Sequence, residues 1–186
     1  ATELVSKLSN ATQRNARHTM FSHYLTTHQD LPLWVLVTKL TFGEITNFYK
    51  LITPNIQERI LKDIHKEYTG EYKVSITDPT STLIPVFSEI LDVLVGYRNV
   101  CAHGDRLYNH RIIGPKKTIK KLTYYFVQTP KGSESSVYGV LISLRLLLPR
   151  ISYKCIIDEV INELILLSES LPVIQFNQVL ARMELT

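Results

Sequence analysis

The feature that most constrains this chain is an apolar stripe between Thr82 and Ala102. Its members recur at the three- and four-residue spacing of one helix face, and they are Leu83, Val86, Phe87, Ile90, Val93, Leu94, Tyr97 and Cys101. Such a face must be buried against other elements, so the stretch predicts the central helix of a folded domain. Gly104 follows, and a glycine there typically ends a helix in the left-handed conformation.

Polar residues near the end of this helix indicate a site that binds phosphate and transfers protons. Arg98 lies beside the stripe, and His103 follows it with four residues between them. An arginine holds phosphate with a fixed fork of donors, and a histidine moves protons near neutral pH. Together they are the minimum for cleaving a phosphodiester that carries its own nucleophile, the 2′-hydroxyl of RNA. The amide of Asn99 can position the phosphate or orient the histidine.

The spacing of the pair leaves its geometry open. Five steps along a regular helix are a rotation of about 140°, so Arg98 and His103 would not converge on one helix. Either a helix end shaped by Gly104 or a second copy of the motif could bring them together. The structural alternative is an ion pair of Arg98 with Asp92 or Asp105, and a favourable interaction of His103 with the helix dipole.

A block of positive charge follows the motif directly. Its six cations, without any acid between 106 and 121, are Arg106, Arg111, Lys116, Lys117, Lys120 and Lys121. A charge run is usually a solvated surface, but its position beside a candidate phosphate site favours binding of RNA backbone. Asn109 joins this RNA-binding set and can fix the loop by hydrogen bonds. Residues 120–127 are β-prone and predict an extended loop or short strand.

Two blocks, in matching order and spacing, resemble the Abi-like (AbiD/AbiF) abortive-infection family of the HEPN superfamily. One is Arg-Asn-Val-Cys-Ala-His-Gly-Asp-Arg-Leu-Tyr-Asn at 98–109, and the other is Leu-Trp-Val-Leu-Val at 33–37 leading into Leu-Thr-Phe-Gly-Glu-Ile at 40–45. The resemblance runs from about Leu31 to Asn109. It implies an all-α, HEPN-like helical bundle with ribonuclease activity. It also implies a homodimer, in which two Arg/His pairs build one composite site.

The first half of the chain predicts several helices. Residues 2–28 form one helix with a weak apolar side. Asp30 caps a helix that starts at Leu31 and places Trp34 at a core edge or interface. Thr41 and Glu44 fit a capping box, so the next stripe begins either a second helix or the continuation of a kinked one.

Further helices follow on both sides of the central one. A helix after Thr53-Pro54 has Ile56, Ile60, Ile64 and Tyr68 on one face. Towards the C-terminus, periodic apolar residues predict helices at 137–148, 153–170 and 172–183. We find neither an internal repeat nor a linker, so we expect a single domain over residues 1–186.

The composition excludes several classes of protein. The 186 residues are 45% hydrophobic, which suffices for a core. The longest apolar runs are interrupted by charges at Lys39, Asp92 or Arg145, short of the roughly 20 residues of a membrane span, and no secretory signal is evident. The two cysteines, Cys101 and Cys155, fall in apolar patterns and are expected to be buried free thiols. A cytoplasmic protein fits these features.

No metal or cofactor is expected. His23 and His28 suggest a metal pair, but no third ligand is placed to complete a zinc site. A phosphate-binding glycine loop, a Gly-x-Ser-x-Gly elbow and a His-Glu-x-x-His helix are all missing from the sequence.

The function that these features predict is a metal-independent endoribonuclease of an abortive-infection or toxin–antitoxin system. Its catalytic residues would be Arg98, Asn99 and His103, its substrate RNA, and its restraining partner a protein or RNA antitoxin. A second hypothesis is a non-catalytic HEPN domain that binds RNA or assembles complexes. A third is a helical module whose basic block meets an acidic partner. Activity separates the first from the others, and salt-dependent RNA affinity separates the second from the third.

Overall fold

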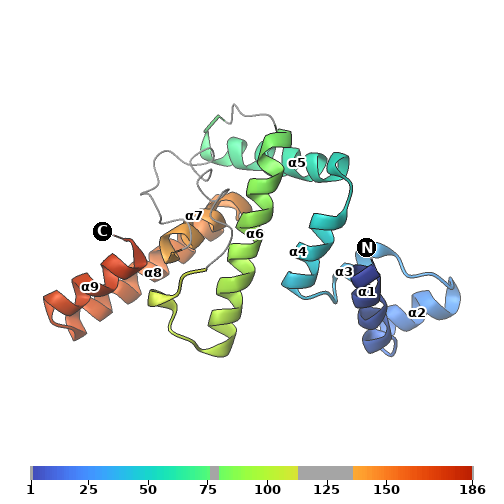
Figure 1. Ribbon diagram of the computed structural model, residues 1–186, viewed down its shortest axis with the longest axis horizontal. Coiled ribbons are helices and arrows are strands. Elements are labelled where there is room, and N and C mark those ends of the chain that lie inside the picture. The colour runs from blue at the N-terminus through green and yellow to red at the C-terminus, as the bar shows by residue number, and fades with distance from the viewer. Residues whose placement is uncertain (1, 76–79, 113–135, 186) are drawn as a thin grey trace. The chain divides into compact units, whose positions relative to one another are not determined.

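The computed structural model describes residues 2–75, 80–112 and 136–185. Within these ranges all regular structure is helical, which confirms the all-α prediction. The contacts divide the chain into two compact units, residues 1–53 and 54–186 (Figure 1). The single domain over 1–186 and the HEPN-like arrangement stay predictions. The β-prone stretch 120–127 and Lys116, Lys117, Lys120 and Lys121 lie outside the described residues.

Four helices build the first unit. They are α1 (Thr2–Asn15), α2 (Thr19–Thr27), α3 (Leu33–Val37) and α4 (Phe42–Leu51). Their core consists of the buried residues Ala11, Phe21, Val35 and Leu36. Trp34 is 58% exposed at the edge of this core, with its ring edge-on to Tyr24 at 5.7 Å between centroids.

The prediction of one helix over residues 2–28 is wrong, because the chain turns between Asn15 and Thr19. The Asn15 Nδ2 donates to the Ala11 carbonyl at 2.8 Å. The His18 N–H then donates to the Asn15 carbonyl at 2.9 Å. An asparagine side chain that bonds to the local backbone competes with helix continuation. The turn also allows Ala11 and Phe21, on two helices, to share one core.

The predicted cap of α4 is confirmed, whereas that of α3 is wrong. The Glu44 N–H donates to Thr41 Oγ1 at 3.3 Å, and the Thr41 N–H donates to Glu44 Oε2 at 2.7 Å, so the box is complete. This backbone hydrogen bond to the carboxylate lowers the pKa of Glu44. Asp30 instead accepts from the Leu31 N–H at 2.8 Å, and α3 begins only at Leu33. Of the two alternatives, two separate helices are observed.

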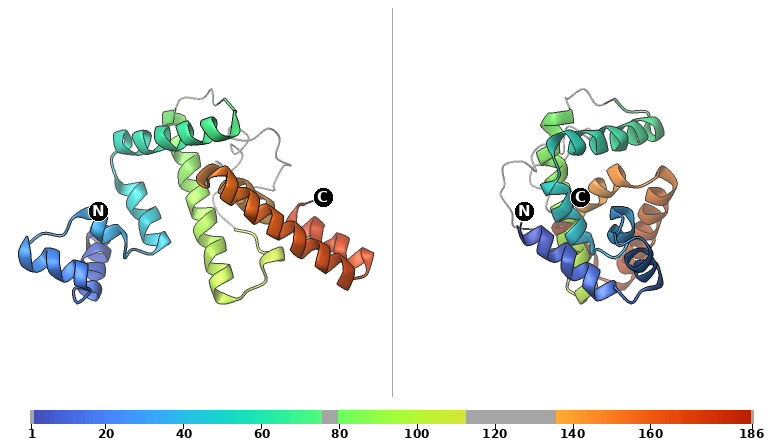
Figure 2. Two further views of the ribbon diagram at one scale, coloured as in Figure 1. Left: turned by 180° about the vertical axis from the view of Figure 1, so that it is seen from behind. Right: turned by 90° about the vertical axis from the view of Figure 1, so that its right-hand side faces the viewer.

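The second unit is built around one long helix. Its elements are α5 (Pro54–Tyr72), α6 (Thr80–His103), the 3₁₀ turn η1 (Leu107–Asn109), α7 (Val137–Leu147), α8 (Arg150–Ser170) and α9 (Val173–Met183). Figures 1 and 2 show α5 crossing near the start of α6, and α8 and α9 running side by side. The three helices predicted at the C-terminus are confirmed to within a few residues.

The apolar stripe of α6 is confirmed apart from its last member. Leu83, Val86, Phe87, Ile90, Val93, Leu94 and Tyr97 are buried, together with Leu91 and Val100. Cys101 is exposed, as is Cys155 on α8, so the expectation of buried thiols is wrong. The reason is that the last turn of α6 extends beyond its cover, since residues 101–109 are all exposed. On α8 no residue is buried.

The expected face of α5 is displaced by one position. Ile56 and Ile60 are exposed, whereas their neighbours Gln57 and Leu61 are buried, as is His65. Tyr68, the last member of the expected face, is buried as predicted. The apolar residues of α5 therefore cover more of its surface than α6 and α7 bury. Which side is covered depends on these partners rather than on the spacing alone.

By length and composition alone, α6 is able to cross a membrane. This goes beyond the expectation that no stretch comes close to such a span. Of its most apolar 18-residue window, 44% is buried inside the protein. The buried part packs against α5 and α7 and forms the centre of the second unit, which is the ordinary place of a core helix.

Candidate functional site

The motif occupies the last turns of α6. Arg98, Asn99 and His103 are exposed, whereas Tyr97 and Val100 on the other side of the helix are buried. The buried side anchors the helix, and the exposed side presents an arginine, an amide and an imidazole to solvent. Arg106 follows three residues after His103 and is also exposed.

The Arg98 side chain is held by its neighbour. Its Nη1 donates to Asn99 Oδ1 at 3.0 Å. Within the described residues, it forms no ion pair with Asp92 or Asp105, so that structural alternative is not the arrangement observed. One hydrogen bond leaves most of the five N–H donors of the guanidinium available for a phosphate.

The end of α6 has the form that Gly104 predicts. Gly104 has φ +69°, its N–H donates to the Cys101 carbonyl at 3.3 Å, and the Asp105 N–H donates to the Val100 carbonyl at 3.1 Å. These two bonds define a Schellman motif. Because the helix remains regular through His103, the directions of Arg98 and His103 still differ by about 140°. The glycine therefore does not bring them together within one chain.

The chain then folds back along α6 as residues 104–112, here called the return loop. Tyr97 Oη donates to the His110 carbonyl at 2.6 Å. The Tyr97 and His110 rings also contact each other edge to face, with 5.2 Å between their centroids. Gly96 makes room for Ile112, because a Cβ at Gly96 would lie 2.4 Å from Ile112 Cδ1. Burial raises the pKa of Tyr97 to about 12, which keeps its hydroxyl protonated as a donor.

The end of α9 contacts the same loop. Arg182 Nη1 donates to Asn109 Oδ1 at 2.8 Å, and Arg111 forms an ion pair with Glu184. Two of the residues predicted to bind RNA thus contact α9. Arg106 forms no ion pair within the described residues, and the four lysines of the set lie outside them.

Comparison with known proteins places this region in a family. The family described as Abi-like protein matches residues 1–109, which is more than half of the chain. The chain belongs to the Abi-like protein family. Membership indicates a role in abortive infection. No curated protein and no solved structure matches the chain.

The Abi-like region ends at Asn109, the residue that Arg182 contacts from outside it. Sequence reasoning missed this contact, and it missed the part that Tyr97 plays as an anchor. A glycine inside a helical pattern, here Gly96, often has a packing reason and was the available signal. The pairing of the loop with Arg182 and Glu184 had no local signal.

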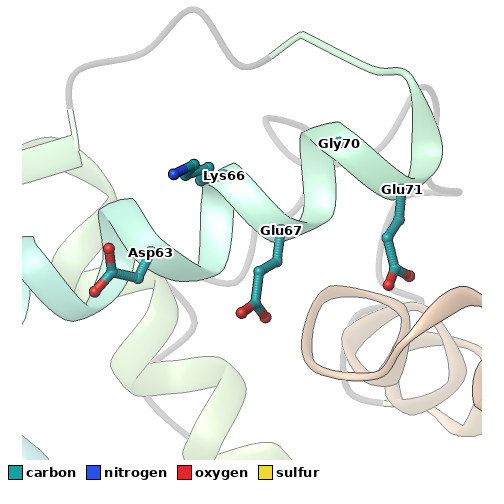
Figure 3. Close-up of a pocket in the computed structure, with 5 residues that line it drawn as sticks. All are labelled: Asp63, Lys66, Glu67, Gly70 and Glu71. Atoms are coloured by element: carbon teal, nitrogen blue, oxygen red, sulfur yellow. The ribbon is translucent and has the colours of Figure 1, made fainter.

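A cavity of about 490 Å³ lies elsewhere in this Abi-like chain, along α5. The described residues that line it are Asp63, Lys66, Glu67, Gly70 and Glu71 (Figure 3). Glu71 accepts a hydrogen bond from the backbone N–H of Arg150, at the start of α8. Among these described residues the acids outnumber the single lysine, which disfavours a polyanion beside them.

The described part of this Abi-like chain contains no group of three His, Cys, Asp or Glu side chains arranged to hold a metal. His23 and His28 do lie near each other, with ring centroids 5.7 Å apart and the rings edge-on. The two rings therefore contact each other edge to face within the first unit.

Proposed function

We propose that this Abi-like protein is a metal-independent endoribonuclease of an abortive-infection or toxin–antitoxin system. The observation that carries the proposal is the exposed Arg98–Asn99 pair and the exposed His103 at one helix end. Exposed arginine and histidine at such an end can reach a phosphodiester in solution, whereas the core residues of the same helix cannot.

The reaction needs a base, a charge stabiliser and an acid. One imidazole removes the proton from the 2′-hydroxyl, and the 2′-oxygen attacks phosphorus. The P–O5′ bond breaks as an acid protonates the leaving 5′-oxygen. Arg98 stabilises the non-bridging oxygens of the transition state. The products are a 2′,3′-cyclic phosphate and a 5′-hydroxyl.

A single His103 does not readily act as base and acid in the same step. The divergence of Arg98 and His103 by about 140° on one helix adds a second reason to involve another copy. We therefore include a homodimer in the proposal, with one histidine from each copy as base and acid. Arg106 and the four lysines of the basic block, Lys116, Lys117, Lys120 and Lys121, bind RNA backbone. A protein or RNA antitoxin restrains the enzyme in the cytoplasm.

The direct test compares wild type, His103→Ala and the control His28→Ala, an exposed histidine of the first unit, on RNA in EDTA. We expect wild type and His28→Ala to cut and leave cyclic phosphate ends, and His103→Ala to be inactive while still binding. His103 is exposed, so its loss should cost no more than about 1 kcal/mol of stability. Equal cutting by His103→Ala, or cutting of RNA with a 2′-deoxy residue at the scissile position, contradicts the mechanism.

The shared site is tested by adding the inactive His103→Ala variant to wild type. If each site needs one histidine from each copy, a mixed dimer lacks either the base or the acid and should be inactive. The activity per wild-type chain should therefore fall as His103→Ala is added in excess and subunits exchange. If the activity per wild-type chain is unchanged although subunits exchange, each chain acts alone and the dimeric site is wrong.

A second candidate is a non-catalytic RNA-binding module, which the same divergence of Arg98 and His103 favours. In that case RNA binds with an affinity that falls with salt, since phosphate contacts release counterions, but no variant and no wild type cuts. Binding without cleavage under all the conditions above decides for this candidate.

A further inference from the structure

The return loop contacts both α6, through His110 and Ile112, and the end of α9, through Asn109 and Arg111. Asn109 and Arg111, which the sequence assigns to RNA, meet Arg182 and Glu184, each 73 residues further along the chain. All four residues belong to the second unit. Both contacts are long-range, because each joins a charged side chain at the end of α9 or just after it to a polar side chain of the loop.

The end of α9 is shaped for this contact. Met183 is buried in a cluster with Val93 and Tyr97 of α6, which fixes the helix end. Glu184 follows with φ +58°, a left-handed conformation that favours glycine. Glu184 therefore has a strained backbone conformation. Its carboxylate, which glycine would lack, forms the ion pair with Arg111.

We propose that Asn109 and Arg111 are positioning residues of the RNA site, acting through Arg182 and Glu184, and that they are not RNA ligands. The inference rests on the proposed function. The guanidinium of Arg111 pairs with the Glu184 carboxylate, and that carboxylate would repel a phosphate placed beside Arg111. Arg106 is exposed and three residues from His103, so the path of the loop determines where its guanidinium lies.

A charge exchange between positions 111 and 184 distinguishes positioning from direct binding. Arg111→Glu and Glu184→Arg alone should each lower kcat by about 10- to 100-fold, the effect of a small misplacement, with little change in KM. Both replacements carry a Cβ, so the strain at position 184 is unchanged. The double variant restores the ion pair and should regain most of the lost kcat.

The salt dependence of binding gives a second readout. Affinity is measured for RNA with a 2′-deoxy residue at the cut position. Replacing a phosphate ligand lowers the slope of log affinity against log salt by about 0.7 for single strands. We expect this change for Arg106→Gln, and no change for Arg111→Gln or for the control Lys154→Gln, an exposed cation on α8. A reduced slope for Arg111→Gln overturns the inference.

Hydrogen exchange of residues 104–112 distinguishes failure of the proposed function from failure of the positioning role alone. The single variants should exchange faster there and the double variant should be protected again. A wild type that neither binds nor cuts RNA overturns the proposed function and this inference together. A wild type that cuts, with a double variant that is protected but inactive, overturns the inference alone, because Arg111 is then needed for its charge.

Discussion

Gly104 and Gly70 form a matched pair for testing the end of the motif helix. A Cβ added at either position meets no atom of the described residues within 4 Å, so neither alanine variant clashes with them. The two sites differ in backbone: Gly104 has φ +69°, whereas Gly70 lies inside α5. Substitution by alanine therefore isolates the energy of the left-handed turn after His103.

The expected magnitudes follow from this difference. A residue with a Cβ in the left-handed conformation costs about 1–2 kcal/mol, partly offset by the reduced freedom of the unfolded chain. Gly104→Ala should thus lose about 1 kcal/mol of unfolding free energy. In α5, alanine replaces the poorest ordinary helix former, and Gly70→Ala should gain about 0.5–1 kcal/mol. The variants should differ by about 2 kcal/mol.

Urea unfolding followed by helical circular dichroism measures this difference. With a slope of about 1–3 kcal/mol per molar urea, the midpoints should separate by about 1 M. Gly104→Asn should lie between the two, because asparagine tolerates the left-handed conformation. If Gly104→Ala is as stable as Gly70→Ala, the Schellman motif at Gly104 does not fix the position of His103. The argued divergence of Arg98 and His103 at the end of α6 is then wrong.

Two further predictions concern the anchors of the return loop. Gly96→Ala should lose about 1–3 kcal/mol, because its Cβ would lie 2.4 Å from Ile112 Cδ1, and adding Ile112→Val, which removes that atom, should recover part of the loss in a double-mutant cycle. Tyr97 has its pKa raised by burial from 10.0 to about 12, so the native state keeps the proton longer. The stabilisation that this raised pKa gives the native state is complete below pH 10 and is lost as the pH rises to about 12. The free energy of unfolding, measured across that range, should therefore fall less for Tyr97→Phe than for wild type.

Features that depend on a few neighbouring residues could be predicted from the sequence. The capping box of Thr41 and Glu44 and the left-handed turn at Gly104 each close within one helical turn. The apolar stripe of α6 could also be predicted from the sequence, because its buried residues recur at helical spacing along a single long helix. In these cases the local pattern and the packing agree.

Features that depend on which helix covers a surface could not be predicted from the sequence. On α5 both Ile60 and Leu61 are apolar, and only contact with α6 and α7 decides that Leu61 is buried. Cys101 continues the stripe by spacing, yet it is exposed because the cover of α6 ends before it. Periodicity gives the apolar face but not its length or its partner.

The candidate site shows the same division. The exposed positions of Arg98, Asn99 and His103 follow from their places beside and beyond the stripe. The contacts of Asn109 and Arg111 lie 73 residues away in sequence, between polar side chains without any repeating pattern. No argument from spacing along the chain could have paired them.

The hydrogen bonds that close the end of α6 bear on how the proposed site is assembled. Bringing Arg98 and His103 of one chain together requires unwinding the last turn of α6, which breaks the bond from the Asp105 N–H to the Val100 carbonyl. It also pulls on the return loop, which Tyr97 holds through the His110 carbonyl. In the proposed homodimer, a second copy would supply a histidine without breaking these hydrogen bonds. We therefore infer that a shared site requires less rearrangement than a site built within one chain.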